Sequence, residues 1–246
     1  MISISIKEID LSDYFKNKSV IVTGGAGVLG RAVVDWYSSL GATVAVLDYS
    51  DDLLAKAFPN PSERHFYVAC DLTQKESCAD AVGRVIRQFE KIDVLANIAG
   101  GFLMGDPVHE TSDETWDFLF NLNTRSIMNM GAAVVPGMLA QSSGKIVNVA
   151  ARAALAGMAN MGAYTASKAA VMRLTESMAM ELREKGINVN AVMPSLIDTP
   201  RNRDDMPDAD YSRWVVPEQI ASVIGFLSSG ESNAVHGACI PVDGLS

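Results

Sequence analysis

The sequence is poor in the residues that build metal centres and disulfide frameworks. Among its 246 residues it has only three cysteines and three histidines, and neither set shows metal-ligand spacing or a pairing pattern. We therefore expect no metal site. We expect Cys70, Cys78 and Cys239 to be reduced packing residues, which suits a cytoplasmic protein.

Long apolar runs and an excess of positive charge are missing as well. No stretch approaches the roughly 18 apolar residues that a membrane-spanning helix needs. The first eight residues alternate and turn acidic, unlike the order of a signal peptide. The formal net charge of −9 argues against nucleic acid and anionic membranes as partners, so a small-molecule substrate is expected instead.

Short apolar runs alternate with helical patterns along the chain. The expected strands cover residues 20–23, 43–47, 66–69, 94–96, 145–149, 188–192 and 238–241. The expected helices cover residues 29–40, 51–57, 74–89, 113–140, 163–185 and 217–228. This alternation predicts the α/β class, with a doubly wound, seven-stranded parallel sheet covered by helices on both faces. We expect a single domain over residues 18–246, preceded by an extension over residues 1–17 that forms an edge strand or an intersubunit arm.

A glycine-rich turn follows the first expected strand and opens the first expected helix. Glycines at such a turn let the backbone approach a pyrophosphate, whose charge the N-terminus of the helix favours. A tight turn that only packs the helix is the alternative. The residues assigned to dinucleotide binding on this ground are Gly24, Gly25, Gly27, Val28, Leu29 and Gly30.

The second expected strand ends next to Asp48, eighteen residues after Gly30. A carboxylate there can accept hydrogen bonds from both hydroxyls of an adenosine ribose, and it would repel a 2′-phosphate. No Arg or Lys lies at positions 25–28 or 49–50 to neutralise such a phosphate. The expected cofactor is therefore NAD, although a solvated acidic residue at a strand end would look the same.

Tyr164 and Lys168 form the most specific chemical pair in the chain. Residues four apart share one face of a helix, so the ammonium of Lys168 can lie beside the phenol of Tyr164. A neighbouring cation favours the phenolate, and we expect it to lower a pKa that is near 10 in the free side chain. Tyr164 is thus a candidate general acid and base.

Taken in order, these motifs resemble the short-chain dehydrogenase/reductase family over about residues 18–245. The resemblance implies a Rossmann-type fold and an NAD(H)-dependent oxidoreductase that transfers hydride between nicotinamide and a small organic substrate. Tyr164 would be the acid/base, assisted by Lys168, and Asn123 would shape the active-site helix. The family also implies a homodimer or a homotetramer.

The same resemblance assigns further site residues by position. Those implied for the cofactor are Asp71, Leu72, Asn97, Ala99, Gly100, Pro194, Ile197 and Thr199, together with Tyr164 and Lys168. Residues 102–110, 155–161 and 195–214 should build the mouth of the pocket. The residues expected to line the substrate pocket are Ala151, Phe102, Met158 and Met161, although ordinary core or lid packing is the better explanation for each methionine taken singly.

Ala151 is the main departure from the family, which usually has Ser thirteen residues before the Tyr. A fixed donor to the oxygen of a reacting ketone commonly contributes about 2.7–4 kcal/mol, and this chain lacks it. Segments 24–30, 99–102 and 151–155 resemble dihydropteridine reductase, whose conjugated substrate is easier to reduce. We therefore favour a dihydropteridine-reductase-like reductase of conjugated substrates. The alternatives are an alcohol dehydrogenase or ketone reductase with a substitute for the Ser, and a non-catalytic dinucleotide-binding protein.

Overall fold

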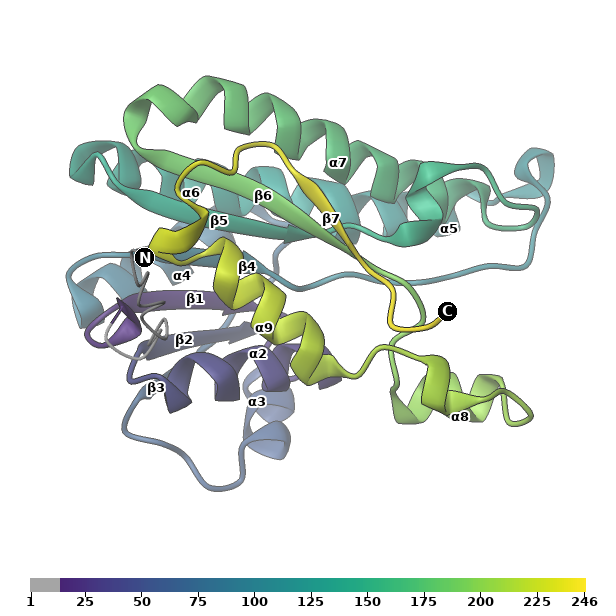
Figure 1. The fold of residues 1–246 in the computed structure, drawn as a ribbon, viewed down its shortest axis with the longest axis horizontal. Coiled ribbons are helices and arrows are strands. Elements are labelled where there is room, and N and C mark those ends of the chain that lie inside the picture. The colour runs from purple at the N-terminus through teal and green to yellow at the C-terminus, as the bar shows by residue number, and fades with distance from the viewer. Residues whose placement is uncertain (1–13) are drawn as a thin grey trace, which may run out of the picture.

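The structure is a computed structural model that describes residues 14–246. Seven strands form one sheet in the order β3-β2-β1-β4-β5-β6-β7, and every neighbouring pair is parallel (Figure 1). In chain order they are β1 (Ser19–Thr23), β2 (Thr43–Asp48), β3 (His65–Ala69), β4 (Val94–Asn97), β5 (Gly144–Val149), β6 (Ile187–Pro194) and β7 (Cys239–Val242). The expected class and strand number are confirmed.

The first strand, β1, lies in the interior of the sheet, and the later strands are added first on one side of it and then on the other. The chain runs outward from β1 to β3 and returns to β4 on the other side of β1. Thr23 at the end of β1 lies opposite both Leu47 and Asn97. Its Oγ1 accepts hydrogen bonds from the amides of Ile98 and Ala99 (3.1 and 3.2 Å). A ligand crevice is expected at this reversal of strand order, beyond the carboxyl ends of the strands.

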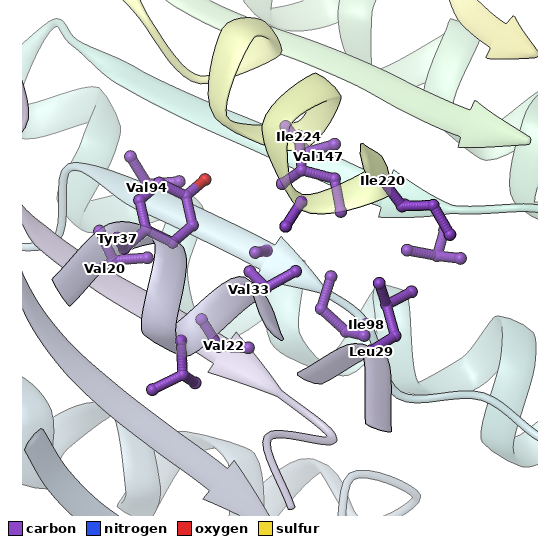
Figure 2. Close-up of a cluster of buried hydrophobic side chains, with 14 of the residues drawn as sticks. Val20, Val22, Leu29, Val33, Tyr37, Val94, Ile98, Val147, Ile220 and Ile224 are labelled. Atoms are coloured by element: carbon purple, nitrogen blue, oxygen red, sulfur yellow. The ribbon is translucent and has the colours of Figure 1, made fainter. Parts of the chain in front are cut away.

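Helices cover both faces of the sheet. α2 (Val28–Ser39) and α9 (Pro217–Leu227) pack together on one face. α4 (Lys75–Phe89), α6 (Ser126–Gln141) and α7 (Gly162–Leu182) cover the other. Figure 2 shows the first of these two cores, in which α2 and α9 contact the apolar side chains of β1, β4 and β5. The labelled residues are Val20, Val22, Leu29, Val33, Tyr37, Val94, Ile98, Val147, Ile220 and Ile224.

The helix expected over residues 113–140 is not continuous. It consists of α5 (Asp113–Phe120), a π-helical turn (Asn121–Arg125) and α6. Two further helices are short: α3 (Asp51–Ala57), as expected, and α8 (Pro200–Asp205), which the sequence pattern did not predict. α8 begins after Thr199, whose side-chain oxygen accepts a hydrogen bond from the amide of Asn202 (3.2 Å). Such a cap explains why a six-residue segment with Pro at its first position forms a helix.

Most of the expected N-terminal extension lies outside the described residues, and so does any edge strand or arm that it forms. Its last part packs into the domain: Phe15 is fully buried. The ring of Phe15 meets those of Trp36 and Tyr37 edge-on, each with a centroid distance of 5.3 Å. Within residues 14–246, no helix is long and apolar enough to span a membrane.

Candidate active site

A cleft of about 1190 Å³ lies beyond the carboxyl ends of the strands. The loops after β1 to β6 all contribute to it, as the crossover between β1 and β4 predicts. The residues expected from sequence that line the cleft are Gly24, Gly27, Val28, Leu29, Gly30, Asp48, Asp71, Leu72, Ala99, Gly100, Phe102, Ala151, Tyr164, Lys168, Pro194, Ile197 and Thr199.

The glycine turn is shaped mainly by the packing of the protein itself. Gly24 has a φ of +64°, and a Cβ there would lie 2.7 Å from the Cα of Ala99. A Cβ on Gly30 would lie 2.0 Å from the carbonyl oxygen of Gly24. The expectation that these glycines serve the approach of a ligand is therefore incomplete. Gly25 is buried against Val46 and is not part of the cleft lining.

The departure from the family at Val28 has a simple structural reason. Val28 is the first residue of α2, where the backbone is helical and a side chain is tolerated. The first turn of α2 contains no acidic residue. The partial positive charge at this helix end therefore meets no carboxylate from its own first turn.

Asp48 is held at the end of β2 by backbone amides. Its Oδ2 accepts a hydrogen bond from the amide of Ala26 (2.9 Å), and its Oδ1 accepts one from the amide of Tyr49 (2.8 Å). These bonds tie the carboxylate to the glycine turn and aim it at the cleft. The ring of Tyr49, which is 69% exposed, lines the same end of the cleft.

Tyr164 and Lys168 lie on the first turns of α7, and burial dominates the acidity of both. Burial raises the pKa of Tyr164 from 10.0 to about 12. Burial also lowers the pKa of Lys168 from 10.5 to about 8. The Nζ of Lys168 donates a hydrogen bond to the backbone oxygen of Val149 (2.8 Å). The expectation that Lys168 lowers the pKa of Tyr164 is wrong for this structure, because burial of the phenol raises that pKa.

Asn123 explains the π-helical turn. Its Oδ1 accepts from the amide of Gly101 (2.8 Å), and its Nδ2 donates to the carbonyl of Gly101 (3.1 Å) and to Oγ of Ser167 (3.0 Å). Ser167 in turn donates to the backbone oxygen of Tyr164 (2.8 Å). Asn123 is 1% exposed and does not line the cleft. It therefore connects the loop after β4 to α7 and positions Tyr164.

Gly100 occupies a tight place between two of these groups. A Cβ at Gly100 would lie 2.9 Å from Nζ of Lys168 and 3.0 Å from Oδ1 of Asn123. Both contacts are shorter than nearly all real Cβ contacts. Any side chain at position 100 would displace the ammonium, the amide or both.

A second, smaller cavity of about 110 Å³ adjoins the cleft at Tyr164. Met161 lines this cavity, and Tyr164 is the only residue within 14–246 that lines both spaces. The ring of Phe102 meets that of Tyr164 edge-on, at a centroid distance of 4.8 Å. Ala151 lies on the cleft side and is 6% exposed. Tyr164 thus stands where a substrate and a cofactor would meet.

Two other expected residues lie outside both spaces. Asn97 is 4% exposed and donates from Nδ2 to Oδ1 of Asn148 (2.8 Å), so it joins neighbouring strands and does not face a ligand. Met158 is 51% exposed and is absent from either lining. The pocket wall expected from the methionines is therefore only partly correct.

Several lining residues were missed by reasoning from the sequence. Those on α5 and the π-helical turn come into the cleft through the fold and leave no local pattern. Those beside recognised motifs could have been found by extending each motif by one residue. The missed residues are Ala26, Tyr49, Leu53, Cys70, Thr73, Ile98, Gly101, Phe118, Asn121, Leu122, Val149 and Ala150, whereas Ser195, Pro200 and Arg201 belong to the expected mouth of the pocket.

The remaining titratable residues form no metal site in the part of the chain that the structure describes: no group of three or more His, Cys, Asp or Glu could hold an ion there. Cys70, Cys78 and Cys239 are free thiols.

Comparison with known proteins finds relatives that match nearly the whole chain. Residues 18–210 match the model of the short chain dehydrogenase family. The 3-oxoacyl-(acyl-carrier-protein) reductase FabG of Thermotoga maritima is 34% identical over 242 residues, which cover 93% of this chain and 97% of that protein. The NAD-dependent glycerol dehydrogenase of Listeria innocua is 31% identical, with 98% of each chain covered.

A solved structure of an NAD+-bound xylitol dehydrogenase superposes with a TM-score of 0.87. It is 28% identical to this chain, with 94% of this chain and 99% of that chain covered. Family model, relatives and fold agree on the family of this chain. The chain belongs to the short-chain dehydrogenase/reductase family, whose members are oxidoreductases that bind a nicotinamide dinucleotide.

Proposed function

We propose that the protein is an NAD(H)-dependent oxidoreductase that interconverts a small carbonyl compound and its alcohol, with Tyr164 as the acid/base. The named activities of the two relatives and the structural neighbour, which concern a 3-oxoacyl group, glycerol and xylitol, support this class of reaction. Tyr164 carries the proposal, because it is the residue that the cleft and the smaller cavity share.

The residues of the cleft fit a nicotinamide dinucleotide. The N-terminus of α2, whose first turn contains no acidic residue, suits a pyrophosphate. The carboxylate of Asp48 suits two ribose hydroxyls, and it would repel the 2′-phosphate of NADP. We therefore propose a preference for NAD(H). Ile197 and Thr199, at the other end of the cleft, are proposed to hold the carboxamide of the nicotinamide.

The bound nicotinamide supplies or accepts the hydride, and the protein handles the proton. With a pKa of about 12, Tyr164 is a neutral phenol near pH 7 and can donate its proton to the oxygen of a carbonyl substrate. With a pKa of about 8, most Lys168 carries its charge near pH 7 and stabilises the phenolate that forms. Reduction should therefore slow above about pH 8, where Lys168 loses its proton.

A turnover assay with paired variants tests this proposal. NADH oxidation is followed with dihydroxyacetone, a 3-oxoacyl thioester and simple ketones, and alcohol oxidation is followed with glycerol and xylitol. Tyr164→Phe should lower kcat on the best substrate by about 10²–10⁴-fold, the usual contribution of a positioned proton donor, and should leave the Kd for NADH within twofold. Wild-type kcat in Tyr164→Phe would overturn the role of Tyr164, and a wild-type protein that binds no dinucleotide would overturn the function.

Ala151 favours a second candidate, a reductase of conjugated substrates such as a quinonoid dihydropterin. Ala151 lines the cleft and provides no hydroxyl where the family usually has one. If ketones are the substrates, Ala151→Ser should raise kcat/KM for them by up to about 10²-fold. If conjugated compounds are the substrates, the new hydroxyl finds no developing alkoxide, and their kcat/KM should stay flat or fall. The two rates measured in parallel decide between the candidates.

We further propose a homodimer or homotetramer in the cytoplasm. Large apolar side chains on α5, α6 and α7 are 41–70% exposed and are available for contacts between subunits. They are Trp116, Met128, Leu139 and Met180. Light scattering coupled to size-exclusion chromatography measures the mass, and a monomer at micromolar concentration would contradict this assembly.

A further inference from the structure

The charges of the cleft are unevenly distributed along its length. Within the described chain, the lining contains two carboxylates, Asp48 and Asp71, and two cations, Lys168 and Arg201. The carboxylates follow β2 and β3, whereas the cations come from α7 and α8. Lys168 is 5% exposed and already donates to the carbonyl of Val149. Arg201 is therefore the cation that a ligand in the cleft can recruit.

Arg201 is loosely engaged by the protein. Its Nε lies 3.8 Å from Oδ2 of Asp205, one turn later on α8, and the two side chains are 73% and 60% exposed. An exposed pair at this distance contributes little to stability. Arg201 can therefore exchange Asp205 for a stronger anion at small cost.

Other residues of α8 bond to the rest of the protein, and these contacts fix the backbone position of Arg201. Arg203 forms a two-pronged ion pair with Asp198, with N–O distances of 2.6 and 2.7 Å, and its guanidinium lies 4.7 Å from the centroid of the Tyr211 ring. Asn202 donates from Nδ2 to the carbonyl of Ile197 (2.7 Å). α8 extends from the carboxyl end of β6, where Figure 1 shows it away from the main body of the sheet. These bonds commit Arg203 to the protein and leave Arg201 to the cleft.

We propose that Arg201 binds the pyrophosphate of the dinucleotide. This inference rests on the proposed function, because it takes the ligand to be a dinucleotide. The pyrophosphate is the central, doubly charged part of such a ligand, between the ribose expected at Asp48 and the nicotinamide expected near Tyr164. The N-terminus of α2 and Arg201 line the same cleft, and in this proposal both bind the pyrophosphate.

Ligand fragments test the proposal separately from catalysis. The Kd values of NADH, ADP-ribose and adenosine are measured by calorimetry or fluorescence for wild type and Arg201→Gln. The variant should bind NADH and ADP-ribose about five- to tenfold more weakly, since a charge-assisted contact is lost, and adenosine should bind within twofold of wild type. The loss should shrink as salt is raised, because salt screens an exposed pair.

Arg173→Gln is the matched control. Arg173 is 69% exposed and pairs with Glu176 on its own helix, as Arg201 pairs with Asp205, but it does not line the cleft. Arg173→Gln should leave the Kd values of NADH, ADP-ribose and adenosine unchanged. Asp205→Asn removes the competing carboxylate and should leave binding of ADP-ribose unchanged or strengthen it up to about twofold.

The possible outcomes are distinct. If Arg201→Gln binds NADH and ADP-ribose as tightly as wild type at low salt, Arg201 does not contact the pyrophosphate. An equal loss for adenosine would show a general disturbance of the cleft and would also overturn the proposal. If wild type itself binds no dinucleotide, the proposed function fails and this inference fails with it.

Discussion

The two ends of the cleft hold their charged groups in opposite ways. The carboxylate of Asp48 is only partly buried, and two backbone amides of nearby residues hold it in place. The ammonium of Lys168 is buried, and its pKa falls to about 8. The first end is built for binding a polar ligand at little cost. The second keeps a cation where burial disfavours it, which is typical of groups that take part in proton transfer.

The sharpest test of this contrast removes the buried charge. Lys168→Met should lower kcat by about 10²–10⁴-fold, since the proton donor loses its supporting cation. The net effect of Lys168→Met on the free energy of unfolding should be small, because two contributions oppose each other. Removing a buried cation with a lowered pKa gains about 3 kcal/mol at neutral pH. Leaving the carbonyl of Val149 unpaired costs about 1–3 kcal/mol.

The pH dependence of stability is the second measurement on the same variant. Between about pH 8 and 10.5, Lys168 is neutral in the folded state and protonated in the unfolded state, so wild-type stability should rise with pH. Lys145, whose pKa burial also lowers to about 8, contributes a similar rise. Lys168→Met should make this slope less positive by the contribution of Lys168 in urea titrations, because Lys145 and the buried tyrosines and thiols contribute alike to both proteins. An unchanged slope would show that Lys168 is not neutral in this range.

A substitution at Gly100 should impair the catalytic end of the cleft without replacing any charged residue. Because a Cβ would lie close to both Lys168 and Asn123, Gly100→Ala should lower kcat by about 10–100-fold through misplacement of these groups. Gly157→Ala is the control, since no atom lies within 4 Å of a Cβ there. Steady-state kinetics that show equal effects of the two variants would contradict this reading of the contact.

A substitution at the adenosine end should change the affinity for the cofactor and leave kcat nearly unchanged. Wild type should bind NADH at least about tenfold more tightly than NADPH, which corresponds to about 1.4 kcal/mol, because Asp48 repels the extra phosphate. Asp48→Ala should narrow this ratio and leave kcat at saturating cofactor nearly unchanged. Equal Kd values for the two cofactors in wild type would refute the preference for NAD(H).

The smallest effect is expected at the first residue of the edge strand β3, at the end of the strand that is remote from the cleft. Burial lowers the pKa of His65, whose ring nitrogens contact Oγ of Ser38 (2.7 Å) and the hydroxyl of Tyr67 (3.0 Å). The lowered pKa stabilises the fold above about pH 6.5, and this contribution is lost as the pH falls through the folded-state value. His65→Gln should flatten the acid side of the Tm profile by less than about 2–4 °C, since His65 is only half-buried. Identical profiles would exclude His65 as the titrating group.

The same contrast explains what the sequence could predict. The adenosine end can be recognised from short stretches of sequence. The glycine turn, Asp48 and Asp71 each lie at or just after the end of a strand, and each belongs to a motif of a few neighbouring residues. Periodicity gave all seven strands to within two residues because buried parallel strands are nearly continuous apolar runs. Tyr164 and Lys168 were equally visible, since four-residue spacing on a helix is a local property.

The catalytic end depends on contacts between distant segments, and there prediction failed in part. The π-helical turn arises because Asn123 bonds to Gly101 and Ser167, which lie 22 and 44 residues away. The raised pKa of Tyr164 depends on burial by the whole fold and could not be read from its spacing to Lys168. Resemblance to the family assigns Asn97 to the cofactor, whereas its side chain bonds to Asn148 and does not line the cleft.

The bond between the amide of Gly105 and the carbonyl of Asn160 (3.0 Å) has a consequence for protein engineering. It joins the two loops that form most of the smaller cavity, and the side chains of Met104, Asp106 and Asn160 on these loops are exposed. Surface substitutions away from packed positions usually change stability by about 0.5 kcal/mol or less. A combinatorial library at Met104 and Asp106 should therefore diversify substrate range while the folded yield stays constant, whereas position 160, where Asn160 has a φ of +60°, should be kept as Asn or changed only to Gly.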